Sequence, residues 1–186
     1  LDEAYLDVTD SEYCGGDPEK MALQIRQKIS EDLGITASAG ISSNKFLAKI
    51  ASDWNKPNGQ FSVTDNDIDK FVLKIPVRSI HGVGKKTEMV LKSKNINTCE
   101  DLQEFKKYDL IDMLGKYGET LHQLCRGIDK REVKSHRIRK SLSVEDTFEK
   151  DLKDFELCST ELSILYKELL KRIDDGNYKN KKIKSC

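Results

Sequence analysis

The sequence lacks the features that mark membrane proteins, zinc domains and disulfide-linked domains. Its 186 residues contain no apolar run that approaches the roughly 20 residues needed to cross a bilayer. The five cysteines are widely spaced without a Cys-x-x-Cys pair, and the three histidines fall at no metal-ligand spacing. These absences exclude a membrane-spanning protein and argue against a zinc site or a disulfide framework. Unpaired cysteines are typical of a reducing intracellular compartment, so we expect a cytoplasmic protein.

The chain also lacks a net charge, because 32 Lys and Arg residues balance 32 Asp and Glu residues. The balance hides an asymmetry: residues 1–80 carry nine basic and 13 acidic side chains, whereas residues 81–186 carry 23 basic and 19 acidic ones. Basic residues gather between Lys130 and Lys140 and again from Lys171 onward. This distribution suggests that the second half binds a polyanion. Solvated helix faces and a charged linker are the alternative that charge alone leaves open.

An initiator methionine and a signal peptide are absent, and the chain opens directly into a strand-like pattern. Apolar residues alternate with other residues from Ala4 to Val8, which predicts a half-buried strand. Asp2 and Glu3 stand just before this strand. Two carboxylates at a hairpin tip suit Mg²⁺, which favours one or two carboxylates plus substrate phosphates. A pair of solvated turn acids is the alternative.

Helix and strand patterns alternate up to about residue 65. The spacing predicts a helix over residues 18–33, with Asp17 as its cap and Gly34 as its end. Strands are predicted over residues 35–41 and 60–63. A helix between them is predicted to begin at Ser42 or Ser43 and to carry on its apolar side Phe46, Leu47, Ile50, Ala51 and Trp54. This order indicates an α+β or α/β arrangement in which helices pack on a sheet.

Beyond Asp65, which is predicted to cap the next helix, short helices dominate. Thr98 and Asp101 form a predicted capping box, and His122 is interpreted as a histidine at the edge of the core. Residues 142–146 suggest the start of a strand, and a helix of roughly 20 residues is expected after it.

Residues 80–87 carry a pattern typical of a helix-hairpin-helix, in which two glycines flank one apolar residue directly before a helix. Glycines allow the backbone to approach a phosphate, and the free N–H groups of the helix N-terminus point at it. The segment is not a Walker A loop, because it lacks that motif's first Gly and final Ser or Thr. A plain turn between core helices is the alternative. The residues predicted to hold a DNA backbone are Gly82, Val83, Gly84, Lys85 and Lys86.

Four runs, in this order and spacing, resemble the Y-family translesion DNA polymerases of the DinB, or DNA polymerase IV, kind. They are residues 1–9 with the paired carboxylates, residues 36–54 with Lys45 and Lys49, the Lys-Pro-Asn-Gly turn at residues 56–59, and residues 80–86. The resemblance implies an α+β fold. Its parts would be a partial palm sheet with packed helices (1–65), a small all-helical thumb with a helix-hairpin-helix (66–130), a basic linker (131–140) and an incomplete α/β little finger (141–186).

The resemblance also implies metal-dependent nucleotidyl transfer on damaged template DNA. Two Mg²⁺ ions would align the primer 3′-hydroxyl with the α-phosphate of an incoming deoxynucleoside triphosphate. Asp2 matches a metal-bridging carboxylate, and Glu3 matches the catalytic acid beside the ion that activates the hydroxyl. Lys56 matches a lysine that neutralises the triphosphate, while Lys45 and Lys49 could contact the nucleotide or be structural. Primer–template DNA is the expected partner, bound by a monomer.

Several parts of the family pattern have no counterpart in the chain, namely the other metal-binding Asp, the fingers and the clamp-binding peptide. We therefore expect an excerpt of a longer enzyme, cut at both ends and inactive as a polymerase by itself. For the intact parent, a sliding clamp is a further possible partner. Two other interpretations stay open: a non-catalytic helix-hairpin-helix module that binds DNA, and a palm of the nucleotide-cyclase type.

Overall fold

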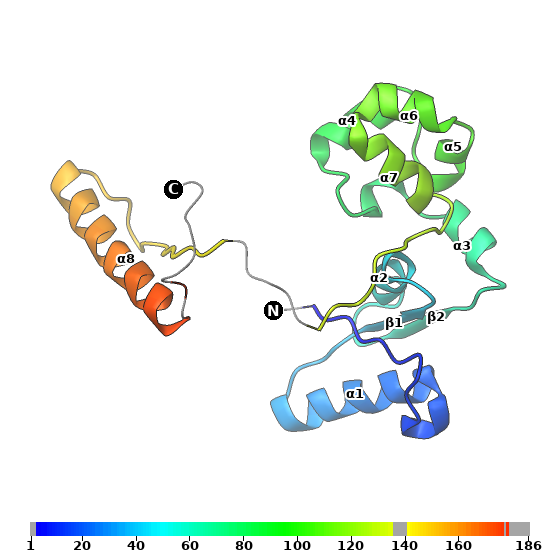
Figure 1. Cartoon of the computed structure of the whole chain (residues 1–186), viewed down its shortest axis with the longest axis horizontal. Coiled ribbons are helices and arrows are strands. Elements are labelled where there is room, and N and C mark those ends of the chain that lie inside the picture. The colour runs from blue at the N-terminus through cyan, green and yellow to red at the C-terminus, as the bar shows by residue number, and fades with distance from the viewer. Residues whose placement is uncertain (1–2, 136–140, 177, 179–186) are drawn as a thin grey trace. The chain divides into compact units, whose positions relative to one another are not determined.

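A computed structural model describes residues 3–135, 141–176 and 178 of the chain. These residues form two compact units, Leu1–Val133 and Lys134–Cys186, which are considered separately below. The first unit contains a small sheet with its helices and a group of short helices, and the second contains one long helix (Figure 1).

The first unit begins with a short 3₁₀ helix, η1 (Tyr13–Gly16), and the amphipathic helix α1 (Pro18–Leu33). The side chain of Asp17 accepts hydrogen bonds from the backbone N–H groups of Glu19 and Lys20 at 3.0 and 3.1 Å. Gly34 ends α1 in the left-handed conformation, with φ of 67°. Both predicted caps and the predicted extent of this helix are confirmed.

The sheet consists of two parallel strands, β1 (Ala39–Ser42) and β2 (Gln60–Val63), paired in register from Ala39 with Gln60 to Ser42 with Val63. Helix α2 (Lys45–Trp54) connects them, and in Figure 1 it lies on one side of the strands while α1 lies on the other. Gly40 allows the close approach of β1 to α2, since a Cβ there would lie 2.0 Å from the carbonyl oxygen of Ala48. The strand over 60–63 is confirmed, whereas the earlier one is shorter than predicted.

The strand predicted between Ala4 and Val8 is wrong for the described residues, which have no strand before β1. A strand requires a neighbour for its backbone hydrogen bonds, and no described segment pairs with residues 3–8. The apolar side chains of this segment are accordingly uncovered, with Leu6 64% exposed.

Two predicted caps are also wrong. Asn44, rather than Ser42 or Ser43, caps α2, because its side chain accepts a hydrogen bond from the backbone N–H of Leu47 at 3.0 Å. Helix α3 (Ile68–Leu73) begins after Asp67, not Asp65, and the structure records no side-chain cap there. Instead, the hydroxyl of Thr64 donates to the carboxylate of Asp67 at 2.5 Å.

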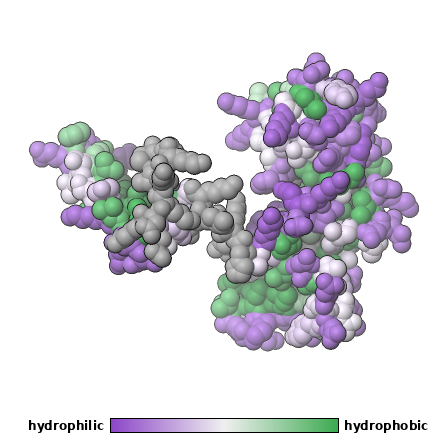
Figure 2. Space-filling view, viewed as in Figure 1, coloured by the Kyte–Doolittle hydropathy of each residue, from purple (hydrophilic) through white to green (hydrophobic). Residues whose placement is uncertain are grey.

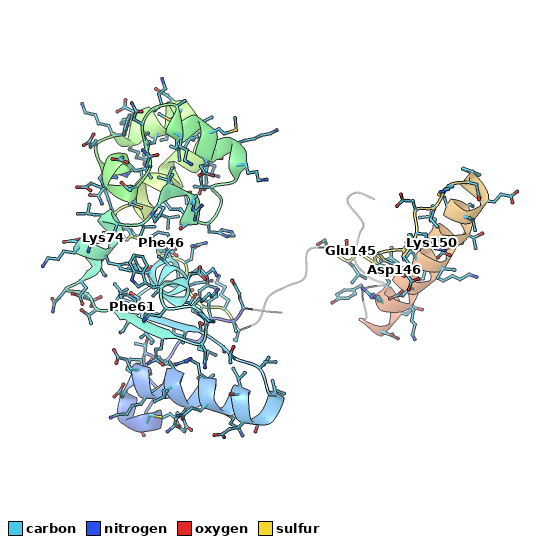
Figure 3. All side chains as sticks on the ribbon, turned by 180° about the vertical axis from the view of Figure 1, so that it is seen from behind. Phe46, Phe61, Lys74, Glu145, Asp146 and Lys150 are labelled. Atoms are coloured by element: carbon cyan, nitrogen blue, oxygen red, sulfur yellow. The ribbon has the colours of Figure 1, made fainter. Side chains whose placement is uncertain are left out.

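Short helices follow, as predicted: η2 (Val77–Ser79), α4 (Lys85–Lys92), α5 (Cys99–Gln103), α6 (Lys107–Leu114) and α7 (Lys116–Leu124). The capping box of Thr98 and Asp101 is confirmed. One hydrophobic cluster joins α2 and β2 to the short helices, from Phe46 and Leu47 on α2 to Leu121 and Leu124 on α7. Phe46 on α2 belongs to this cluster and Phe61 on β2 packs against it; Figure 3 labels both residues.

The second unit contains α8 (Phe155–Asp175), which confirms the predicted helix of about 20 residues. The strand predicted over 142–146 is wrong, because residues 141–149 carry no regular secondary structure. Within this unit no described strand is available to pair with that segment. The apolar side of α8 stays open to solvent, with Phe155 86% and Leu162 67% exposed. In the described part of the chain, no helix is long and apolar enough to cross a membrane.

Candidate functional site

A row of four alternating charges joins two of the predicted site residues, Glu3 and Lys56. The ammonium of Lys49 on α2 binds the carboxylate of Glu3, and its Nζ also lies 3.5 Å from Oδ2 of Asp53. The Nζ of Lys56 lies 2.5 Å from Oδ1 of Asp53. Glu3, Lys49, Asp53 and Lys56 are called the charge row below. Asp2, the other predicted carboxylate, lies outside the described residues.

Helix geometry explains why Lys49 and Asp53 lie together, since residues four positions apart share one face of α2. Lys56 lies just beyond the end of α2, in the turn at residues 56–59. The hydrogen bond from Lys49 to Glu3 is the largest influence on Lys49 and, with the charge of Asp53, raises the pKa of that lysine. Partial burial raises the pKa of Asp53, but the hydrogen bond from Lys56 and the charge of Lys49 outweigh it and leave that pKa lowered. Both shifts favour the ionised forms of the two inner residues, Lys49 and Asp53.

The turn at residues 56–59 is held in place by Arg26 of α1. Its Nη2 donates to the carbonyl oxygen of Asn58 and, at 2.9 Å, to Oδ1 of the same residue. Its Nε donates at 2.9 Å to the carbonyl oxygen of Ala37, just before β1. Because the guanidinium is planar, it fixes this turn relative to the sheet in a defined orientation.

A second set of contacts lies at the first turn of α2. The backbone N–H of Phe46 donates at 3.0 Å to Asp129, whose side chain is only 3% exposed. Arg131 forms a forked ion pair with the same carboxylate, at 2.8 and 2.7 Å. Burial raises the pKa of Asp129, but the hydrogen bonds from Arg131 outweigh that effect and lower it. The Lys45 ammonium lies nearby, 4.8 Å from the ring centroid of Tyr5.

The predicted hairpin lies between η2 and α4. Gly82 has φ of +95°, and the N–H of Val83 donates to the carbonyl oxygen of Ile80 at 3.0 Å. Gly84 precedes the first turn of α4 without a side-chain cap, and Lys85 and Lys86 are exposed. The backbone N–H groups at this helix end have the arrangement that binds phosphate.

Tyr117 of α7 packs against the hairpin and holds it through a hydrogen bond. Its hydroxyl donates at 2.7 Å to the carbonyl oxygen of His81, and its ring leaves no room for a side chain at Gly82. A Cβ on Gly82 would lie 2.8 Å from both the Cε2 atom and the hydroxyl oxygen of Tyr117. Burial raises the pKa of Tyr117 to about 12, so its hydroxyl keeps the proton that it donates.

The predicted site residues that the structure describes thus lie in two places, at the charge row and at the hairpin. Sequence reasoning missed four supporting residues, namely Arg26, Asp53, Tyr117 and Asp129. The spacing of Lys49, Asp53 and Lys56 along the chain could have revealed Asp53. The other three residues contact segments that are distant in the sequence, so no local sequence pattern indicates them. Among described residues, no group of three or more His, Cys, Asp or Glu side chains could hold a metal ion. His122 is half-buried, and burial lowers its pKa.

Comparison with known proteins matches two separate parts of the chain to family models. Residues 1–53 match the model of the impB/mucB/samB family, and residues 78–129 match the model described as DNA polymerase-iota, thumb domain. The chain is 47% identical over 181 residues to DNA polymerase IV of Ectopseudomonas mendocina and 50% identical over 173 residues to that of Legionella pneumophila. The chain belongs to the Y family of DNA polymerases.

The alignments cover most of the chain but only half of each relative. They span 96% of the chain and 51% of the Ectopseudomonas protein, and 93% and 49% for the Legionella protein. The fold agrees with solved structures of the same family. The crystal structure of DinB from Sulfolobus solfataricus has a TM-score of 0.61 at 28% identity and covers 69% of this chain and 38% of its own. A Y-family DNA polymerase chimera gives a TM-score of 0.63 at the same identity and coverage.

These relatives confirm the α+β class with its partial sheet and helical thumb. A surface hollow near the sheet, lined by Trp54, Phe61, Phe71 and Lys74 among others, includes none of the predicted site residues. Figure 3 shows Phe61 and Lys74 on neighbouring elements there.

Proposed function

We propose that the chain supplies part of the active site and the thumb of a translesion DNA polymerase, which extends primers on damaged template DNA. One observation supports this proposal above the others. Glu3 and Lys56, which match the family's catalytic acid and triphosphate-binding lysine, lie at the two ends of one charge row on the edge of α2.

Glu3 has the chemistry of one ligand of a divalent metal ion. Glu3 offers a carboxylate, the ligand type that Mg²⁺ prefers, and in the structure this carboxylate already binds a cation, the ammonium of Lys49. Glu3 and Asp2 would hold the metal in the proposed enzyme. The chemistry that two Mg²⁺ ions supply when bound is alignment of the primer 3′-hydroxyl with the α-phosphate and neutralisation of the developing charge.

The chain's own residues would bind and orient the substrates. Lys56 is half exposed at the end of the charge row, where its compact ammonium can neutralise a triphosphate. Arg26 keeps the turn that carries Lys56 in a fixed orientation. The hairpin from Gly82 to Lys86 would hold the duplex through backbone N–H groups and ammonium charges, without reading its sequence.

The proposed domains have the boundaries expected from the sequence: palm over 1–65, thumb over 66–130, linker over 131–140 and the start of a little finger over 141–186. The full-length polymerase would act as a cytoplasmic monomer on primer–template DNA, with a sliding clamp as a further partner. Because the chain spans about half the length of its relatives, we expect residues 1–186 alone to lack polymerase activity. Templated primer extension by the purified chain would contradict this expectation.

The decisive experiment uses the full-length polymerase that contains this segment. Asp2→Ala and Glu3→Ala should each reduce primer extension by at least about a hundredfold while leaving primer–template binding intact, because the lost groups act on the reacting atoms. Asp10→Ala removes an exposed acid of the same segment and serves as the matched control. Unchanged extension in the Glu3 variant would refute the catalytic assignment.

A non-catalytic DNA-binding module is the second candidate, and the hairpin geometry favours it. This module would bind duplex DNA through Gly82–Lys86 whether or not Glu3 and Lys56 are intact. Duplex binding by the Glu3 variant together with undiminished function in cells exposed to DNA damage would favour the module over the polymerase.

A further inference from the structure

Asp53 and Lys49 each contact two oppositely charged side chains rather than one. Lys49 contacts both Glu3 and Asp53, and Asp53 contacts both Lys49 and Lys56. The two inner charges of the row thus hold the two outer charges, which are the ones that the proposed polymerase needs for its ligands.

The ligands of a polymerase would remove both outer charges from their present partners. A divalent cation takes a carboxylate such as Glu3, and a triphosphate takes an ammonium such as Lys56. Lys49 would then stand beside a bound cation, which it repels, and Asp53 would have lost its closest ammonium. The two inner residues are already 3.5 Å apart on one face of α2 and can neutralise each other.

We propose that Asp53 is a positioning residue for metal binding, which draws Lys49 away from Glu3 as the metal ion and the triphosphate bind. This inference rests on the proposed function of the site. Before binding, Lys49 is shared between Glu3 and Asp53, and Asp53 also pairs with Lys56. After binding, Lys49 pairs with Asp53, and no charge of the row is left without an opposite partner.

The exposure of the four side chains suits such an exchange. Lys49 is 30% exposed, and the side chains of Glu3, Asp53 and Lys56 are about half exposed. Ion pairs at this level of exposure are weak enough to be exchanged, since each changes an equilibrium by only about two- to fivefold. A buried pair would resist the exchange.

The test measures metal binding directly. Free Mn²⁺ is followed by electron paramagnetic resonance while it is titrated into the full-length polymerase bound to primer–template DNA and a deoxynucleoside triphosphate with a non-reactive primer end. Asp53→Asn should weaken Mn²⁺ binding by about two- to fivefold, because Lys49 then stays on Glu3. Lys49→Met should strengthen it by a similar factor. Asp53→Glu, which keeps the carboxylate, should restore most of the loss.

The double variant separates an exchange of partners from a general change of charge. If Asp53 acts by removing Lys49, the Asp53→Asn effect should disappear in the Lys49→Met background. An effect of the same size in that background would overturn the proposal. Asp32→Asn is the matched control, because it breaks an i,i+4 lysine–aspartate pair on α1 that is remote from the charge row.

Two further measurements complete the test. The Mg²⁺ concentration for half-maximal extension should rise in Asp53→Asn by the same factor as the Mn²⁺ dissociation constant, with kcat at saturating Mg²⁺ retained. A fall in kcat alone would indicate a structural role and overturn the proposal. Glu3→Ala tests the proposed function separately. If it leaves Mn²⁺ binding unchanged, Glu3 is not a metal ligand. If Glu3→Ala weakens Mn²⁺ binding and Asp53→Asn does not, only the proposed exchange of ion-pair partners is refuted.

Discussion

At the residue scale, the carboxylate of Asp129 needs compensating partners, because its side chain is only 3% exposed. Burial of a charge is unfavourable unless hydrogen bonds and an opposite charge compensate. Phe46 and Arg131 supply both, and the negative charge lies at the N-terminus of α2, where the helix dipole favours it. Asp129 therefore links the start of α2 to the segment that leaves the helical group.

Replacing Asp129 should reveal this link in the stability of the chain. Asp129→Ala should lower the free energy of unfolding by about 2 kcal/mol, because the N–H of Phe46 loses its acceptor and Arg131 loses its partner. Urea denaturation followed by circular dichroism measures the change. Asp112→Ala, at an exposed acid of α6, is the control and should have little effect. An equally small effect at Asp129 would show that the contact is not stabilising.

The same residue predicts a pH dependence. The pKa of Asp129 in the folded chain lies below the usual value of 3.8, so its ionised form favours the folded state. Its contribution is fully present above the unfolded value and is lost as the pH falls through the folded pKa. The difference in unfolding free energy between the chain and Asp129→Asn should stay constant from about pH 7 to 5 and shrink below about pH 4. A difference that grows on acidification would contradict this sign.

At the element scale, the two glycines of the hairpin before α4 have different surroundings, because one is needed for the fold and the other is accessible. Gly82 has a positive φ and faces the ring of Tyr117, whereas a Cβ on Gly84 would meet nothing within 4 Å. Gly82 is therefore required by the fold of the hairpin itself, and Gly84 is left open for a ligand that approaches the helix end.

Substitutions at the two glycines should separate stability from DNA binding. Gly82→Ala should destabilise the chain by about 1–3 kcal/mol, since it combines backbone strain with a clash, while Gly84→Ala should change stability by less than about 0.5 kcal/mol. Both should weaken duplex binding regardless of sequence, measured by fluorescence anisotropy at one stated salt concentration. Unaltered affinity in Gly84→Ala would contradict a phosphate contact there.

The turn at residues 56–59 offers a second test at this scale. Arg26→Met removes the hydrogen bonds that join this turn to α1 and to the segment before β1. In the full-length polymerase, KM for the incoming nucleotide should rise by about three- to tenfold with a smaller change in kcat, because Lys56 is less well oriented. Lys28→Met, on the same helix, is the control. A fall in kcat with KM unchanged would place the role of Arg26 elsewhere.

At the scale of the whole molecule, the hydrophobic core belongs to the first unit. Among described residues, the buried hydrophobic side chains all lie between Met21 and Cys125, and α8 has none. The surface of α1 and the segment after it also exposes apolar residues, with Leu33 67% and Ile35 59% exposed, and Figure 2 shows hydrophobic surface in this part of the molecule.

The distribution of the core predicts that residues 1–133 fold independently of the rest. A truncated chain ending at Val133 should keep its melting temperature within about 2 °C of the 186-residue chain, because no buried side chain is removed. Differential scanning calorimetry of both chains measures this. A fall of about 10 °C would indicate that residues 134–186 contribute to the stability of the first unit.

The sequence by itself determined the elements whose signals are local. The ends of α1 were predictable because Asp17 and Gly34 satisfy backbone groups within a few residues. The strand at 60–63, the capping box at Thr98 and the turn at Gly82 were predictable for the same reason.

Only the tertiary structure decided what those elements contact. The alternation between Ala4 and Val8 predicts a strand, yet a strand also needs a neighbour, and the sequence pattern does not supply one. The roles of Arg26, Asp129 and Tyr117 depend on contacts between residues 11 to 83 positions apart in the chain. The charge row combines both kinds of information. Helix spacing places Lys49 and Asp53 on one face of α2, whereas the fold brings Glu3 and the turn with Lys56 to its two ends.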